Sequence, residues 1–332
     1  MSVRERYEEL ERRILSPRAA LAAESRGRVR EEEPSEYRTC FQRDRDRVVH
    51  CKSFRRLKHK TQVFLAPEGD HFRTRLTHTL EVSQIARTIA RALALNEDLT
   101  EAIALGHDLG HTPFGHAGER ALDRVMEGGF RHYEQSVRMV EKLENDGEGL
   151  NLTDEVRNGI LCHTKGTEAY TLEGRIVRMA DKVAYIHHDM DDAIRAGVLK
   201  ETDIPAAVRA ELGENRGDRL DTLITDVINN SVDQIMLSPA KAEAFDELYK
   251  FMFSALYVNP TVKSEERKAE ELVTVLFEWY REDPVRLPAE AQAIAWQEGP
   301  DRAIADHLAS MTDNYVVELY QQIFIPRRWE LK

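Results

Sequence analysis

The spacing of apolar residues constrains the fold more than any other feature of the chain. From residue 75 onward they recur every three or four positions, with almost no alternation of period two long enough to make a strand. Segment 75–95 shows the pattern, because His78, Val82, Ile85 and Ile89 share one helical face. The sequence therefore predicts an all-α fold, with His78 on a buried face.

Capping residues and prolines indicate where the helices begin and end. Asn96, followed by acidic residues, is a typical N-cap, and Gly110 is the expected stop of that helix. Further helices are expected at about 115–127, 132–145, 153–163 and 175–196, and 66–74 reads as a loop or short hairpin. Helical runs, including 301–324, continue beyond residue 200, and prolines separate them.

Length and composition narrow the class of protein. A chain of 332 residues fits one large domain or two modest ones. Cys40, Cys51 and Cys162 form no CxxC pair, so we expect reduced, structural thiols. The charged start "MSVRERYEELERRILS" has no apolar core, and no run reaches the roughly 18 to 20 apolar residues of a membrane span. We expect a cytoplasmic protein without a membrane segment.

Charge is unevenly distributed. The net charge of −12 disfavours general attraction to nucleic acid. Residues 38–60, however, hold nine Lys or Arg against Asp44 and Asp46. Such a segment is either a solvated face or an anion site, and its position just upstream of the histidine-rich stretch favours the anion site. It could hold single-stranded nucleic acid weakly.

Histidines and carboxylates are concentrated in "AIALGHDLGHTPFGHAGE" (102–119). His107 and Asp108 end one predicted helix, and Asp181 lies among apolar residues of another, where a carboxylate is costly unless it is paired or binds a metal. A lone buried histidine is usually an ordinary core residue, but the combination indicates a metal site. The four candidate ligands are His78, His107, Asp108 and Asp181.

This ligand set suits one divalent ion per site. Two imidazoles and two carboxylates favour Mn, Fe, Co or Ni, whereas a site specific for Mg prefers oxygen ligands alone, so the ion, Mg included, is left open. Four protein ligands leave room for water or a phosphate oxygen, as phosphoester hydrolysis requires. Asp181, Tyr185 and Asp189 fall at i, i+4 and i+8, so one helix face should line the site.

The order His78, His107 with Asp108, then Asp181 resembles the HD-domain metal-dependent phosphohydrolases. More narrowly, "HFRTRLTHTLEV", "GHDLGHTPFGHAGE", "HYEQSVR" and "LEGRIVRMADKVAYIHHDMDDA" resemble the deoxynucleoside triphosphate (dNTP) triphosphohydrolases, the dGTPase-like proteins of bacteria. The resemblance is strong over 38–195 and weaker beyond. It implies an HD-domain helical bundle with additional C-terminal helices. Residues 1–60 would pack on an HD core of 61–200, with 201–332 in the same globular unit.

The resemblance also implies a reaction, in which a dNTP is hydrolysed at the α-phosphorus to a deoxynucleoside and intact tripolyphosphate. His116 would be the catalytic histidine, with Glu119 as its carboxylate partner at i+3. A carboxylate on one ring nitrogen sets the tautomer and raises the basicity of the imidazole, which fits it for proton transfer. His132 is assigned to proton transfer or phosphate contact.

Substrate contacts follow from the same resemblance. Arg75 and Lys182 match residues that hold phosphates, and Tyr185 with Asp189 match a deoxyribose pocket that excludes a 2′ hydroxyl. His111 lies four residues after His107, but the glutamate of an HExxH zinc motif is absent, so we expect it to support a ligand or contact phosphate. Gln62 is either near the base or sugar or an ordinary polar loop residue.

The sequence says less about regulation and assembly than about the active site. Members of the resembled group are usually homo-oligomers with activating nucleotides bound at subunit contacts. Arg43, Arg45 and Arg47 of "RDRDR" are our candidates for such a site, with a salt-bridged surface helix as the equal alternative. The chain reads as short for the group, and the segments that select the base diverge after about residue 200.

Two rival hypotheses remain at this point. The same site could act on another nucleotide phosphoester, although the many basic and histidine groups suit a substrate with several phosphates. The chain could instead be a nucleotide-sensing scaffold, which would be expected to have lost a metal ligand or His116. Neither is lost.

Overall fold

Helices make up most of the part of the chain that the structure describes. The computed structural model describes residues 1–62, 73–164, 166–257 and 260–326. In these ranges extended backbone pairs only in two isolated bridges, Arg28 with Thr153 and Thr61 with Thr74. The all-α prediction is therefore confirmed. Over the same ranges, every helix is too short or too polar to cross a membrane.

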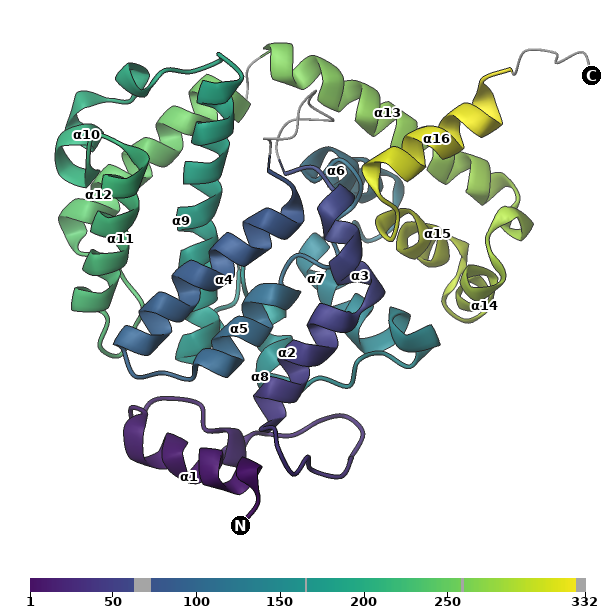
Figure 1. Ribbon diagram of the computed structural model, residues 1–332. Helices are drawn as coiled ribbons and strands as arrows, with labels where there is room; N and C mark the ends of the chain where they lie inside the picture. Colours follow the sequence, from purple (N-terminus) through teal and green to yellow (C-terminus); the bar gives the residue numbers. More distant parts are fainter. Residues whose placement is uncertain (63–72, 165, 258–259, 327–332) are drawn as a thin grey trace, which may run out of the picture.

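Five helices form the centre of the molecule (Figure 1): α2 (Cys40–His50), α4 (Arg75–Ala92), α5 (Glu97–Gly106), α8 (Asp154–Leu161) and α9 (Leu172–Arg195). Helix α4 packs against α5 and α9, while α2 and α8 pack against α5. The stripe predicted for α4 is buried: His78, Val82, Ile85 and Ile89. Burial of this face fixes His78 in the interior, where three helices meet.

Other helices of the first 200 residues lie around this centre: α1 (Val3–Ile14), α3 (Lys52–Arg56), α6 (His116–Val125) and α7 (His132–Arg138). Helix α7 continues into a π-helical turn, Met139–Leu143. The helices expected at 115–127, 132–145, 153–163 and 175–196 are thus present to within a few residues. Most of 66–74, expected as a loop or hairpin, lies outside the described residues.

Of the two helix ends predicted from capping residues, one is confirmed and one is wrong. The Asn96 side chain accepts a hydrogen bond from the Leu99 backbone, which confirms the predicted N-cap of α5. The predicted stop at Gly110 is wrong, because α5 ends at Gly106 and a turn follows. Gly110 is needed for packing instead, since a Cβ atom there would lie 2.1 Å from the Ser136 nitrogen of α7.

The helices beyond residue 200 pack in two groups on opposite sides of the centre (Figure 1). The first group packs beside α4 and α9: α10 (Ala206–Leu212), α11 (Arg216–Asn230) and α12 (Pro239–Met252). The second group shares a separate apolar core with α6: α13 (Pro260–Glu282), α14 (Ala289–Glu298), α15 (Pro300–Ala309) and α16 (Asp313–Phe324). The helical run 301–324 is divided in two, because Thr312 caps α16.

The three cysteines are free thiols. Cys51 and Cys162 are buried and Cys40 is partly buried. Burial raises the pKa of Cys40 and of Cys51 to about 12, so both thiols stay protonated at neutral pH. Protonated, buried thiols agree with the structural role expected for them.

Buried polar contacts connect the second C-terminal group to the loop 111–115. The Lys60 ammonium is buried and donates to the carbonyls of His111 and Ala309, the latter at 2.7 Å. The Asp313 carboxylate accepts from the Phe114 nitrogen at 2.9 Å and from the Thr61 nitrogen at 2.8 Å. Residues far apart in the sequence therefore fix one short loop.

A second buried carboxylate, Asp306 of α15, connects the same group to α7. It accepts from Gln135 at 2.8 Å and from Arg138 at 2.7 Å, both of α7. A buried carboxylate is tolerated when several donors satisfy it. Helices α15 and α16 thus hold both the loop 111–115 and helix α7.

Lys60 makes stability depend on pH. Burial lowers its pKa to about 7. Between about pH 7 and pH 10 the unfolded lysine binds a proton more readily than the folded one, so rising pH favours the folded state. Over this window we expect the unchanged chain to gain on the order of a few kcal/mol of stability relative to Lys60→Met.

Urea unfolding of both proteins at several pH values measures this gain. Because other groups titrate in both proteins alike, only the difference between them matters. Parallel pH profiles would show that Lys60 is not held in a neutral form.

Candidate metal centre and active site

Four buried or partly buried side chains from three elements converge on one point. His78 projects from α4, His107 and Asp108 lie in the turn after α5, and Asp181 projects from α9. His78 Nε2 lies 3.1 Å from an Asp181 oxygen and 3.9 Å from an Asp108 oxygen. His107 Nε2 lies 3.4 Å from Asp108 and 3.8 Å from Asp181. The structure therefore brings together the four predicted ligands.

The tautomer of His107 fits a metal ligand. Its Nδ1 lies 2.7 Å from the Ala104 carbonyl, so it donates there and the proton is absent from Nε2. Nε2 is buried and has no hydrogen-bond partner among the described residues. Donors that bind one divalent ion at about 2.1 Å stand about 3 Å or more apart, as these do. The residues fit a divalent ion with imidazole and carboxylate ligands.

Neighbouring side chains hold Asp108 in place. Arg75 Nη1 donates to one oxygen at 2.8 Å, and His111 Nε2 lies 3.2 Å from the other. Burial alone would raise the Asp108 pKa, but His107, His111 and Arg75 outweigh it and hold the pKa well below its usual value. Arg75, expected to contact phosphate, thus holds a candidate metal ligand in place, and His111 contacts the same carboxylate, as expected for a residue that supports a ligand.

His78 is held by a residue that the sequence reading did not single out. Nδ1 of His188 lies 3.1 Å from Nδ1 of His78, and the other ring nitrogen of His188 pairs with Glu81 of α4. A carboxylate behind an imidazole orients the ring and favours one tautomer. The chain from Glu81 through His188 to His78 resembles this arrangement.

A second cluster lies beside the metal ligands. The Glu119 carboxylate is 3.1 Å from His116 Nδ1 and 2.9 Å from His132 Nδ1, and it also accepts from the His132 backbone. Burial would raise the Glu119 pKa, but hydrogen bonds from both histidines outweigh it and lower the pKa well below its usual value. The His116 side chain is about half exposed, at 52%. The structure thus brings the predicted pair together and adds His132 to it.

His111 connects the two clusters. Its ring stacks on His132 with centroids 4.0 Å apart, while Nε2 faces Asp108. Burial, followed by the charge of Arg75, lowers the His111 pKa well below its usual value. A neutral ring therefore stands between the metal ligands and the pair formed by His116 and Glu119.

The face of α9 that was expected to bind the sugar is completed from another segment. The ring of Tyr257 stacks on Tyr185 with centroids 5.7 Å apart, and its hydroxyl donates to Asp189. Burial raises the Asp189 pKa well above its usual value. Tyr257 was missed, because no sequence spacing relates it to residues some 70 positions earlier.

The two remaining substrate candidates lie differently. Gln62 is buried, and its side-chain oxygen has no partner among the described residues. Lys182 is exposed and lines a hollow of about 150 Å³ with Arg175 and Arg178. A basic hollow of this kind can accept phosphate oxygens, and both roles stay predictions.

His163 was also missed by the sequence reading. It is buried directly after α8, and its donor atom lies within 4.8 Å of those of His107 and Asp181. Burial, followed by the charge of His107, lowers the His163 pKa to about 4. One signal was available: like His107, it is a histidine at the end of an apolar helix.

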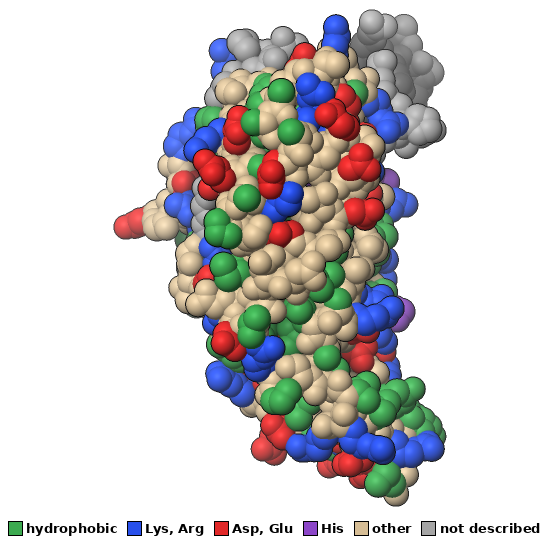
Figure 2. All heavy atoms as spheres, turned by 90° about the vertical axis from the view of Figure 1, so that its left-hand side faces the viewer, with side chains coloured by type: hydrophobic (Ala, Val, Ile, Leu, Met, Phe, Trp, Pro, Cys, Tyr) green, Lys and Arg blue, Asp and Glu red, His purple; other side chains and the backbone are tan. Residues whose placement is uncertain are grey.

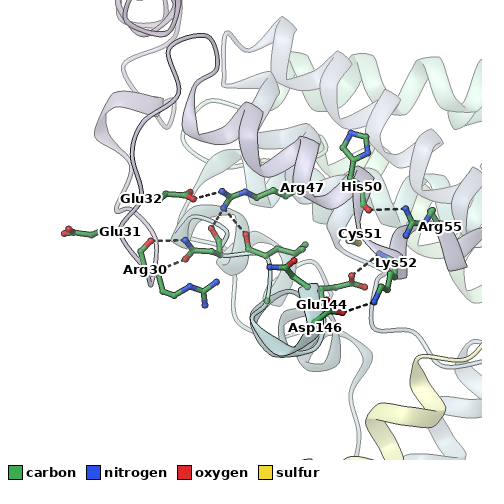
Figure 3. A pocket seen from close by; sticks show the side chains of 14 residues that line it. Arg30, Glu31, Glu32, Arg47, His50, Cys51, Lys52, Arg55, Glu144 and Asp146 are labelled. Atoms are coloured by element: carbon green, nitrogen blue, oxygen red, sulfur yellow. Dashed lines mark hydrogen bonds and ion pairs between the residues drawn. The ribbon is translucent and has the colours of Figure 1, made fainter. Parts of the chain in front are cut away.

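The arginines of the "RDRDR" segment are engaged within the chain. Arg43 and Arg47 pair with Glu32 at 3.3 and 2.6 Å, and Arg45 pairs with Asp98 at 3.1 Å. Arg47 also lines a pocket of about 650 Å³, and its guanidinium bonds to the carbonyls beside the pocket (Figure 3). These contacts favour the salt-bridged helix over the anion site, and a regulatory role stays a prediction.

Two family models match the chain. Residues 75–186 match the HD domain, and 235–322 match the phosphohydrolase-associated domain. The first match contains all four candidate ligands, and the second contains both Asp306 and Asp313. The buried contacts of Asp306 and Asp313 thus run between the two matched regions.

Close relatives match almost from end to end. A deoxyguanosinetriphosphate triphosphohydrolase-like protein of Caldanaerobacter subterraneus is 57% identical over 99% of this chain and 98% of its own length. A protein of the same name from Clostridium perfringens is 48% identical over 98% of this chain and 99% of its own length. These two proteins have nearly the same length as this chain, and the expectation that the chain is short for the whole group stays a prediction.

A solved structure shows the same fold. The crystal structure of a hypothetical protein from Aquifex aeolicus is 18% identical and aligns with a TM-score of 0.50 over 85% of this chain and 71% of that one. Similarity at this level concerns the fold alone. The two relatives and both domain matches show that the chain belongs to the deoxyguanosinetriphosphate triphosphohydrolase-like family of HD-domain phosphohydrolases.

Proposed function

We propose that the chain hydrolyses deoxynucleoside triphosphates to deoxynucleoside and inorganic tripolyphosphate, with one divalent ion per site. The observation that carries the proposal is the juxtaposition of two clusters: four metal-binding side chains and, beside them, His116 paired with Glu119. The names of the relatives support a dGTPase-like hydrolase. The ligands would be His78, His107, Asp108 and Asp181.

The chemistry follows from these two clusters. A divalent ion, when bound, would polarise a phosphate oxygen and stabilise the charge that develops on phosphorus. Nδ1 of His116 faces Glu119, so when both ring nitrogens carry a proton, Nε2 is free to face the substrate and would give its proton to the leaving 5′ oxygen. The half-exposed position of His116 allows substrate to reach it, while His132 shares the carboxylate of Glu119 and stands ready to contact a phosphate.

Substrate selection would involve the face of α9. Tyr185, backed by the Tyr257 ring, would lie against C2′ of the sugar, and Asp189 would bind the 3′ hydroxyl. A ring at C2′ leaves no room for a 2′ hydroxyl, so ribonucleotides would be poor substrates. Gln62 would contact the base or sugar, and Lys182 a phosphate.

The wider assignments are proposals of the same kind. We propose a cytoplasmic homo-oligomer, activated by a nucleotide, that uses Mn, Mg, Fe, Co or Ni. The division of the chain into residues 1–60, 61–200 and 201–332 is also a proposal. Nucleic acid is a weaker candidate partner, since the face in Figure 2 intersperses basic and acidic side chains. Another nucleotide phosphoester is the alternative substrate for the same site.

A product assay tests the proposed reaction. Mn-loaded protein is incubated with each dNTP alone and with an equimolar mixture of all four, and products are separated by ion exchange. We expect tripolyphosphate and deoxynucleoside in equal amounts. Tripolyphosphate that forms in the mixture but not with any single dNTP would show in addition that a second nucleotide activates the protein. Pyrophosphate or orthophosphate as the first product would contradict the proposal.

His116→Ala tests the proton-transfer role. Because general acid–base help is worth about 100-fold to 10,000-fold, we expect turnover to fall by about two orders of magnitude or more. Bound metal and KM should change little, since His116 lies outside the ligand set. His59→Ala is the matched control, because His59 is exposed and lies outside both clusters. Equal turnover in His116→Ala and the control would exclude the role.

Asp181→Ala tests the ligand set. Removing one of four protein ligands should lower Mn affinity by about 10-fold to 100-fold or more, measured by titration of the metal-free protein with Mn and EPR of the free ion. Asp221→Ala, a change at an exposed position of α11, is the control. Full metal affinity in Asp181→Ala would show that Asp181 is not a ligand.

A further inference from the structure

His163 is oriented in the same way as the metal ligand His107. Each histidine follows the end of a helix, α8 for His163 and α5 for His107. Each places Nδ1 at 2.7 Å from the carbonyl three residues earlier, Ile160 and Ala104 respectively. The proton of His163 is therefore on Nδ1, and Nε2 carries a free lone pair.

The lone pair of His163 faces the two clusters of the site. The ring centroid lies 4.9 Å from that of His107 and 5.3 Å from that of His132. His163 is only 2% exposed, and Nε2 has no hydrogen-bond partner among the described residues. Although the residue is almost fully buried, Nε2 is not among the side-chain atoms that are both fully enclosed and without a partner, so a small polar group such as water can reach it and supply the hydrogen bond.

His163 lies close to two of the four candidate ligands. Its donor atom lies within 4.8 Å of those of His107 and Asp181, but this set does not extend to both His78 and Asp108. Donors that bind one divalent ion stand about 3 to 4.2 Å apart, so His163 is near enough to meet either the ion or a water molecule bound to it.

We propose that Nε2 of His163 accepts a hydrogen bond from a water molecule bound at an open position of the divalent ion, and so orients that water for attack on the substrate. The proposal rests on the proposed metal site. It does not depend on which nucleotide is cleaved. Because His163 lies between His107 and His132, the water would stand where the metal ligands meet the proton-transfer cluster.

Two substitutions separate the roles open to His163. His163→Leu fills the same space without an acceptor. His163→Gln can place an amide oxygen near the position of Nε2 and so restores the acceptor. Both variants and the unchanged protein are loaded with Mn, and thermal unfolding confirms that each is folded. Should the leucine variant fail to fold, His163→Gln and His163→Asn form the pair, since the shorter amide cannot reach the position of Nε2.

The first measurement needs no substrate. Transverse relaxation of ¹⁷O in solvent water reports how fast Mn-bound water exchanges. Loss of one hydrogen bond should speed exchange about five-fold in His163→Leu, with His163→Gln in between. Pulsed EPR of the same samples counts imidazole nitrogens bound to Mn, and we expect two in every protein. Unchanged exchange in His163→Leu, or one fewer nitrogen than in the unchanged protein, would overturn the proposal.

Turnover provides the second measurement. We expect kcat to fall about 10-fold to 100-fold in His163→Leu, with KM nearly unchanged and partial recovery in His163→Gln. A residue that only packs the core would lower the unfolding temperature without this recovery. If exchange changes as expected but no dNTP is cleaved by any of the proteins, the water-binding role stands and the proposed substrate is wrong.

Discussion

The buried carboxylate of Asp108 is the group on which the rest of the site depends. A carboxylate in this position is unstable by itself, and Arg75 and His111 stabilise it from two sides. These contacts orient its oxygens toward His78 and His107 and connect α4 to the turn after α5. Asp108 thus links the local structure of the chain to its capacity to bind a metal.

The conformation of the turn that carries Asp108 also depends on contacts from distant segments. Ser136 of α7 donates to the His107 carbonyl at 2.7 Å, and Lys60 donates to that of His111. Asp313 of α16 fixes the Phe114 nitrogen just before His116. Phe114 and Gly115 both have positive φ, of 62° and 55°, so this loop needs outside contacts to hold its conformation. The C-terminal helices therefore help to hold the loop that precedes His116.

The sequence predicted the parts of the site that depend on periodicity. His78 lies on the apolar stripe of its helix, and Asp181 stands out as a carboxylate among apolar residues, so both could be identified as ligand candidates. The roles of His116 and Glu119 came from the family resemblance, and their pairing agrees with the helical spacing. These predictions concern residues within one helix or turn, where backbone geometry determines the neighbours.

Contacts between distant segments could not be predicted in this way. Tyr257, Asp313 and His188 meet the site through tertiary packing, which leaves no regular spacing in the sequence. The contact of Arg75 with Asp108 is of the same kind, because the family resemblance assigned Arg75 to phosphate and did not indicate which carboxylate lies opposite. The stop predicted at Gly110 was wrong for a similar reason, since the close approach of α7, and not helix termination, requires glycine there.

The central claim is that water attacks the α-phosphorus while His116 protonates the leaving 5′ oxygen. Hydrolysis in H₂¹⁸O, followed by mass spectrometry of both products, tests it most directly. If water attacks the α-phosphorus, the bond between phosphorus and the 5′ oxygen breaks. We then expect one ¹⁸O atom in tripolyphosphate and none in the deoxynucleoside. Label in the 5′ hydroxyl of the deoxynucleoside would show attack at carbon, and labelled deoxynucleoside monophosphate would show a different phosphoester reaction. Either result would contradict the account.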